Sequence, residues 1–372
     1  MTDNNNNSYE ASKILLEVSR VVSSSLDPDE VSSLVLKESR KALGTDHASL
    51  FLMDESLGHL VLDKADGLSE DEMDNLRLLG SWEVINDYLV HRKEPLIVED
   101  IHKDEIFKDK KIPFSHEKLP IESFLAVPLE ARGKLIGALL LSNRKRPGHI
   151  FTKEDRDLLL TLSNNIAIAI INARLYYKMK SLFLSTITSL TRAIDAKDSY
   201  TSGHSERVMK YAVAIGRELA LDEESLESLR LSSLLHDVGK IGINENILLK
   251  PAKLLGYERR QIRQHPAIGA KIVGSIDDFQ AVQRGILEHH ERYDGKGYPN
   301  HLKGDKISLQ GRIIAVADVF DALTTDRPYQ KGHLKDDIFH KIEQEAAAQF
   351  DPQVVAAFVA SYRKHPEIWN QE

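Results

Sequence analysis

The stretch LLHDVGKIGI (residues 234–243) is the part of the sequence that says most about the fold. It places a histidine and an aspartate, His236 and Asp237, at the end of a segment whose leucines recur at helical spacing. Other histidines and an aspartate stand in similar helical contexts along the C-terminal half. They are His204, His265, His289, His290 and Asp318. Imidazole nitrogens and carboxylate oxygens without thiolates suit iron, manganese or zinc, so the set predicts a metal centre.

Asp237 has the chemistry to bridge two ions, because a carboxylate can give one oxygen to each, as a two-metal phosphoryl-transfer site requires. The alternative is that these are ordinary packed or surface histidines, since the chain has fifteen of them. This alternative is weaker for Asp318, which interrupts the apolar run 313–320 and would be costly to bury without a cation. We therefore expect the whole set to bind metal.

The segments around these residues resemble, in order, the HD-GYP family, the cyclic-di-GMP phosphodiesterase branch of the HD hydrolase superfamily. They are DAKDSYTSGHSERV (195–208), LLHDVGKIGI (234–243), ILLKPAKL (247–254), HPAIGAKIV (265–273), EHHERYDGKGYP (288–299) and LQGRIIAVADVFDALTTDRPY (309–329). Apolar spacing in this half predicts helices throughout. We expect them at about 204–220, 223–237, 255–264, 266–274, 279–292, 309–325, 335–348 and 352–363.

The resemblance implies a metal-dependent enzyme that hydrolyses cyclic-di-GMP to linear pGpG and then to GMP. It assigns His204, His236, Asp237 and Asp318 to one ion, and Asp237 with His265, His289 and His290 to the other. Tyr200 stands where some members carry a glutamate for a third metal, so we expect two ions. Iron or manganese is expected first, although zinc and nickel suit the same ligands.

Several further residues are expected on the substrate side of this centre by the same resemblance. Lys240 is a proton donor to the leaving oxygen or a phosphate clamp, and Arg327 is a bidentate phosphate contact. Lys331 lies beside Gln330, which stands where a second basic residue is common. Asp321 is grouped with these residues, although its spacing from Asp318 also allows it to orient a ligand histidine.

The loop containing Gly297, Tyr298 and Pro299 is expected to face the substrate and to offer a surface for diguanylate cyclase domains. The alternative is a tight connector, since glycine permits sharp turns and proline stiffens them. Departures at Tyr200 and Gln330 leave a second function open, that of a weakly active cyclic-dinucleotide receptor. A third is an HD hydrolase that acts on another cyclic dinucleotide.

Short apolar segments in the N-terminal half predict an antiparallel sheet. They are 48–53, 60–62, 96–98, 124–129 and 135–141. Helices are expected around residues 14–22, from Pro28 to Leu43, and between about 69 and 91. SFLAVPLEARGKLIGALLLSNR (123–144), followed by FTKEDRDLLLTLSNNIAIAIINARLYY (151–177), resembles a GAF domain. The predicted fold class is thus an α+β GAF-like sensor domain joined by a long helix to an all-α HD-type domain.

A ligand for the sensor domain is not evident from the sequence. Asn143, Phe151 and Asp155 loosely resemble a pattern in cyclic-nucleotide-binding GAF domains. The same residues are explained as a strand end, a core side chain and a helix cap, and this structural interpretation is favoured.

The segment from Thr152 to Ala196 contains no glycine or proline and begins with a capping box, so it predicts one long helix. Its apolar residues could pack on the sensor's own sheet or form the seam of a parallel coiled coil. The seam would continue towards Leu182, Ile187, Leu190 and Ile194, where a partner helix or the catalytic domain would cover it. We expect a homodimer whose sensor domains act on the catalytic domains through this helix.

The overall composition restricts the class of protein. A net charge of −8 argues against a binder of nucleic acid polymers, and the absence of cysteine excludes disulfides and thiol catalysis. No secretory signal or uninterrupted apolar run of membrane-spanning length is evident, which predicts a cytoplasmic protein away from the membrane. The domain limits are predicted as 1–8 for a disordered tail, 9–172 for the sensor, 173–196 for the linker helix and 197–372 for the catalytic domain.

Overall fold

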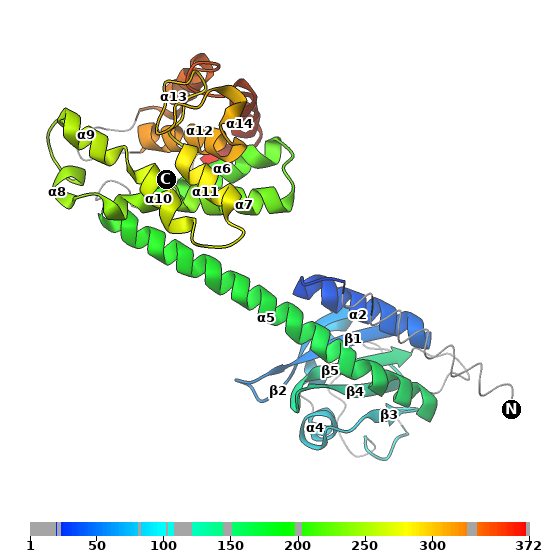
Figure 1. The fold of residues 1–372 in the computed structure, drawn as a ribbon. Coiled ribbons are helices and arrows are strands. Elements are labelled where there is room, and N and C mark those ends of the chain that lie inside the picture. Colours follow the sequence, from blue (N-terminus) through cyan, green and yellow to red (C-terminus); the bar gives the residue numbers. More distant parts are fainter. Residues whose placement is uncertain are drawn as a thin grey trace. The chain divides into compact units, whose positions relative to one another are not determined.

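The computed structural model describes residues 20, 24–80, 83–101, 103–107, 121–143, 151–197, 203–325 and 333–369. The chain divides into two compact units, Met1–Ser181 and Leu182–Glu372. One helix, α5 (Lys153–Lys197), contributes residues to both (Figure 1). The predicted fold class, an α+β sensor domain and a helical C-terminal domain joined by a long helix, is confirmed. The four finer domain limits stay predictions.

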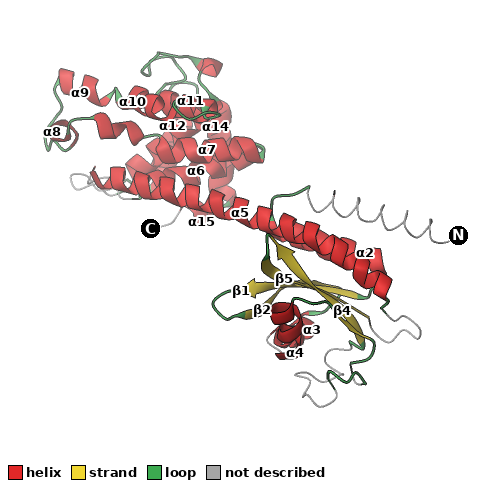
Figure 2. Ribbon diagram, turned by 60° about the horizontal axis from the view of Figure 1, so that its bottom comes forward, coloured by secondary structure: helices red, strands yellow, loops and turns green. Residues whose placement is uncertain are grey.

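The first unit is a five-stranded antiparallel sheet with helices on both faces. Its strands are β1 (His47–Asp54), β2 (His59–Asp66), β3 (Leu96–Val98), β4 (Ser123–Ala131) and β5 (Lys134–Asn143). They lie in the order β2-β1-β5-β4-β3. One face packs against α2 (Pro28–Leu43) and the first half of α5, and the other against α3 (Glu70–Gly80) and α4 (Glu83–Asn86) (Figure 2).

The helix after Asp27 begins and ends where its sequence predicts. Asp27 accepts hydrogen bonds from two backbone amides of the first turn, and Gly44 closes the helix in the left-handed region that glycine tolerates. The helical material expected near 69–91 comprises α3, α4 and a π-helical turn at Asp87–Arg92. The helix expected around residues 14–22 lies outside the described residues.

The second unit is helical. Its helices are α6 (His204–Glu218), α7 (Glu223–Leu235), α8 (Glu245–Leu248), α9 (Gly256–Ile262), α10 (His265–Val273), α11 (Gln280–Glu288), α12 (Leu309–Thr324), α13 (Lys335–Gln344), α14 (Pro352–Lys364) and α15 (Pro366–Trp369). Short 3-10 turns lie at Val238–Gly242 (η2) and Gly304–Lys306 (η3). Tyr211, Phe320, Phe358 and Trp369 pack their rings together in its main core. This core supports α6 and α12, two of the helices that carry the predicted ligands.

The long helix α5 changes its surroundings along its length. Thr152 and Asp155 form the predicted capping box at its start. Leu162 and Ile166 are fully buried in the core on the sensor's own sheet, so this half of the seam is explained by that packing. Further along, Ile187 packs with leucines of α7 in the second unit. At Ile187 the apolar seam is therefore covered by the catalytic domain, one of the two neighbours expected there.

By length and composition alone, the segment Lys153–Asp195 could cross a membrane, since an 18-residue window within it has a mean hydropathy of 1.4. Part of this apolar character comes from the side chains of α5 that pack on the sensor sheet. The core helix of a soluble domain can meet the same criterion for this reason. The expected cytoplasmic location and absence of membrane contact stay predictions.

Candidate metal centre

The predicted ligands come from the ends of several helices in the second unit. His204 and His265 are the first residues of α6 and α10, and His236 and His289 directly follow α7 and α11. Asp318 lies within α12. Ends of helices converge on one place, so side chains distant in sequence meet there. His290 and Asp318 are half-buried and the other five ligands are buried.

The ligand atoms gather into two groups. In each, one atom from every residue lies within 4.8 Å of the others. The first group is His204, His236 and Asp237, and the second is His265, His289 and His290. Asp318 adjoins the first, with its Oδ1 3.3 Å from His204 Nε2 and 4.0 Å from His236 Nε2. All seven predicted ligands are thus brought together.

Asp237 lies between the two groups with one oxygen towards each. Its Oδ1 is 3.3 Å from His265 Nε2, and its Oδ2 is 3.4 Å from His236 Nε2. This is the placement that a carboxylate shared by two ions requires. Lys240 Nζ lies 2.8 Å from the same Oδ2, at the edge of the first group.

Backbone carbonyls fix which nitrogen of each imidazole faces the centre. Nδ1 of His236 lies 2.7 Å from the carbonyl of Ser233, and Nδ1 of His265 lies 2.8 Å from that of Ile262. His289 makes the same contact within its own helix. A carbonyl can only accept, so each Nδ1 carries the hydrogen and each Nε2 presents a lone pair. These imidazoles are therefore oriented as metal ligands are.

Two observations test whether a cation fits among these nitrogens. His265 Nε2 and His289 Nε2 lie 3.3 Å apart, and two lone pairs at that distance repel unless a cation or proton lies between them. Nε2 of His236 is buried and has no hydrogen-bond partner in the described part of the chain. A buried polar atom without a partner is costly, and a bound metal would satisfy it. The donor set therefore fits divalent ions.

The charges of the two groups differ. Burial lowers the pKa of His204, but the carboxylates of Asp318 and Asp321 outweigh it and raise the pKa to about 10. Burial, followed by neighbouring imidazoles, holds the pKa of His289 well below its ordinary value, and burial lowers that of His290 to about 4. The second group is thus neutral at pH 7, whereas the first holds a proton that a metal would displace.

Asp321 lies behind His204 and faces away from the centre. Its side chain is 2% exposed, and its Oδ2 lies 2.7 Å from His204 Nδ1. Arg207 donates to both oxygens of Asp321, at 2.6 and 3.1 Å. These contacts favour a role for Asp321 in orienting His204 over the expected role in binding substrate. Sequence reasoning missed Arg207, although its spacing of three residues from His204 on one helix was a usable signal.

The glycine loop is tied to the centre through its backbone and through one ring. Tyr298 donates from its amide to the carbonyl of His290, and the two rings lie 4.8 Å apart. Glu291, which the sequence analysis also missed, accepts from the amides of Asn300 and Leu302. Gly297 has no room for a side chain, because a Cβ there would meet the backbone nitrogen of Arg292 at 2.3 Å. The loop is therefore held against His290.

A second close backbone approach lies between η2 and α10. A Cβ on Gly239 would meet the carbonyl oxygen of His265 at 1.9 Å. Helix α10 starts at His265, one residue before the expected start at 266, and Nδ1 of His265 bonds the carbonyl of Ile262. Arg327, Lys331, Gln330 and Tyr200 lie outside the described residues.

Comparison with known families assigns both units. A family model described as a GAF domain matches residues 27–170, and one described as an HD domain matches residues 188–354. The chain is a GAF–HD protein. The GAF and HD domains expected from the sequence are thereby confirmed.

Known relatives match about half of the chain. The 3′3′-cGAMP-specific phosphodiesterase 3 of Vibrio cholerae is 39% identical over 185 residues, covering 50% of this chain and 40% of that protein. The cyclic di-GMP phosphodiesterase response regulator RpfG of Xanthomonas campestris is 40% identical over 188 residues, covering 50% of each. The chain spans about half the length of the curated relatives it matches. A solved GAF domain from a Coxiella burnetii phosphoenolpyruvate-protein phosphotransferase has 25% identity and a TM-score of 0.39, covering 46% of this chain and 98% of that one.

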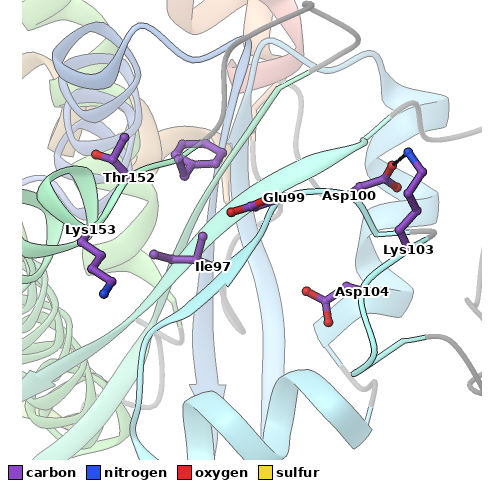
Figure 3. Close-up of a pocket in the computed structure, with 8 residues that line it drawn as sticks. Ile97, Glu99, Asp100, Lys103, Asp104, Thr152 and Lys153 are labelled. Atoms are coloured by element: carbon purple, nitrogen blue, oxygen red, sulfur yellow. Dashed lines mark hydrogen bonds and ion pairs between the residues drawn. The ribbon is translucent and has the colours of Figure 1, made fainter.

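The GAF domain has a cavity of its own beside strand β3. Its volume is about 910 Å³, and Figure 3 shows the residues that line it. They are Ile97, Glu99, Asp100, Lys103, Asp104, Phe151, Thr152 and Lys153. Phe151 is buried in the core and Asp155 caps α5, which supports the structural interpretation of these two residues. The side chain of Asn143 is outside the described set.

Proposed function

We propose that the HD domain hydrolyses a cyclic dinucleotide, with cyclic-di-GMP as the preferred substrate, to linear pGpG and then GMP. The observation that carries this proposal is Asp237, whose two oxygens face two separate groups of metal-type ligands. That placement suits two-ion cleavage of a phosphodiester. The names of the relatives support the substrate class.

In the proposed reaction, the residues of the centre bind the metal ions, fix the imidazole tautomers and contact the substrate. Two divalent ions, iron or manganese by our proposal, supply an activated water and neutralise charge on the phosphoryl oxygens when bound. The seven ligands hold these ions, and the carbonyl contacts keep the imidazoles in the binding tautomer. Lys240 lies beside Asp237, where it can protonate the leaving 3′-oxygen or contact the phosphate. Arg327 and Lys331 remain proposed phosphate contacts.

Direct assay tests the reaction and its metal. Protein prepared anaerobically is loaded with iron or manganese, incubated with cyclic-di-GMP, and the products are separated by chromatography. We expect linear pGpG before GMP. Absence of a linear product with every metal tested, including zinc and nickel, would refute the enzyme and leave binding alone as the function.

A second substrate is favoured by one specific observation, the match to a 3′3′-cGAMP-specific phosphodiesterase at 39% identity. The two substrates differ in one purine base, so residues outside the metal centre must discriminate between them. Competition between cyclic-di-GMP and 3′3′-cGAMP in one reaction ranks them. A higher kcat/KM for the mixed dinucleotide would move our substrate assignment to it.

We further propose that the GAF domain regulates the HD domain through α5 in a homodimer, and that diguanylate cyclase domains are partners of the glycine loop. The last turns of α5 are bonded to the start of α6, next to a metal ligand. Asp195 accepts from Ser205, the residue after His204, and Arg192 pairs with Glu206. Activity of the HD domain should therefore respond to insertions of one to three residues into α5.

A further inference from the structure

Arg263 is a guanidinium near the metal centre without an assigned role. It follows α9 and lies two residues before the ligand His265. Its side chain is exposed, and in the part of the chain that the structure describes it has no ion pair or hydrogen bond through the guanidinium. Instead its Cζ lies over the ring of Tyr298, 5.0 Å from the centroid. It is thus an available cation held at one place.

The support beneath Arg263 leads directly to the metal centre. The ring of Tyr298 lies 4.8 Å from that of His290, tilted by 30°. The Tyr298 amide also donates to the His290 carbonyl, and Glu291 holds the chain beyond Pro299. Arg263 is therefore separated from a metal ligand by one aromatic ring whose position is fixed.

The substrate class offers a second phosphate to a cation outside the metal centre. A cyclic dinucleotide has two phosphates on opposite sides of its macrocycle, and only one can occupy the metal centre in a single cleavage step. The chain has a net charge of −8, so recognition of the other phosphate has to be local. Lys240 is not placed for this task, because its ammonium lies on Asp237 within the centre.

We propose that Arg263 binds the second phosphate of the cyclic dinucleotide, the one that is not being cleaved. A guanidinium presents parallel N–H donors that match two phosphate oxygens, and it gives up only a cation–π contact to do so. The role rests on the proposed function. Arg263 acts in binding and orientation and has no part in the bond-breaking step.

The test compares Arg263→Ala with Arg260→Ala, which removes the same charge from an exposed position on neighbouring α9. The substrates are cyclic-di-GMP and bis(4-nitrophenyl) phosphate, a phosphodiester without a second phosphate. We expect Arg263→Ala to raise KM for cyclic-di-GMP about tenfold, the effect of losing a charge-assisted contact. kcat, metal content and activity on the simple diester should stay at the wild-type level, and Arg263→Lys should be intermediate.

Two outcomes would overturn the proposal. One is a KM in Arg263→Ala equal to that in Arg260→Ala. The other is parallel loss of metal or of activity on the simple diester, which would mean that Arg263 only supports Tyr298 and His290. Binding of a phosphorothioate analogue of cyclic-di-GMP separates this inference from the proposed reaction. If wild type binds the analogue through Arg263 but cleaves no cyclic-di-GMP, the proposed reaction is wrong and the phosphate site stands. If wild type does not bind the analogue, both proposals fail.

Discussion

The metal centre of the HD domain and the cavity of the GAF domain treat charged side chains differently. In the HD centre, Asp237 is buried and its two oxygens face two sets of imidazoles. In the GAF cavity, Glu99 and Lys103 are exposed, and Lys103 pairs with Asp100, three residues before it. His265 Nε2 and His289 Nε2 repel each other without a cation, and His236 Nε2 is buried without a hydrogen-bond partner among the described residues, so the first arrangement demands a ligand, whereas exposed charges such as Lys103 do not. Chemical function can therefore be inferred from the HD domain alone.

The largest expected effect is at Asp237. Asp237→Ala removes the carboxylate between the two ligand groups, so we expect activity below about one thousandth of wild type, together with loss of bound metal. Elemental analysis and the pGpG assay measure both. Asp222→Ala, which removes the cap of the same helix α7 at its other end, is the matched control and should retain metal. Arg327→Ala should keep its metal and raise KM only; equal metal loss in Asp237→Ala and Arg327→Ala would contradict this division.

A smaller effect is expected behind the centre, at Arg207. Arg207→Ala removes the guanidinium that pairs with the buried Asp321, so Asp321 no longer holds His204 in a fixed orientation. Metal affinity should therefore fall about 10–100-fold. Competition with a chelator measures this without any activity assay. Arg207→Lys should retain part of the metal affinity. The control Arg217→Ala, at an exposed site on the same helix, should bind metal as tightly as wild type. Unchanged affinity in Arg207→Ala would show that Asp321 does not depend on it.

The opposite directions of the pKa shifts of His204 and His290 predict how pH affects the metal-free protein. The pKa of His290 is lowered to about 4, so its contribution to stability is lost as pH falls from about 6.5 towards 4. The pKa of His204 is raised to about 10, so its contribution is present below about 6.5 and is lost as pH rises towards 10. Denaturant unfolding across this range should give greatest stability near neutral pH. Metal-loaded protein should lack the alkaline decline, and a metal-free protein that gains stability from pH 7 to 9 would contradict the assignment.

The smallest effect is expected on the exposed face of α5. Leu182 is 65% exposed, so Leu182→Lys should change the free energy of unfolding by less than about 0.5 kcal/mol. Ile187 is 8% exposed, and Ile187→Lys should cost about 2–4 kcal/mol. If α5 mediates the proposed homodimer, Leu182→Lys alone should yield monomers in light scattering. A monomeric wild type at micromolar concentrations would exclude the dimer.

Much of the fold was predictable because local patterns and tertiary packing agree. All five strands and the principal helices were expected, since turn residues such as Gly44 and the Thr152 capping box mark their ends. The neighbour of Ile187 could not be chosen between a partner helix and the catalytic domain, because an apolar spacing does not say which surface covers it. The short helix α8 has no buried residue and no apolar periodicity, so its sequence carried no signal.

The metal-ligand residues were predictable from residue type and resemblance, whereas the residues that contact and position their neighbours were not. Histidines and aspartates in apolar segments are conspicuous because they would be costly without a partner. Arg207, Glu291 and Arg263 are ordinary charged residues in sequence, and only their contacts with Asp321, the loop amides and Tyr298 distinguish them. Such contacts join residues far apart along the chain, and spacing alone does not reveal them.

The missing side chain of Gly239 has a consequence for how this protein can vary. The backbones of η2 and α10 touch there, and η2 follows Asp237 while α10 begins with His265. Even alanine would push the two segments apart and carry a ligand from each group with them. No single substitution at this position preserves the contact, so in a saturation library selected for activity, glycine alone should survive at residue 239.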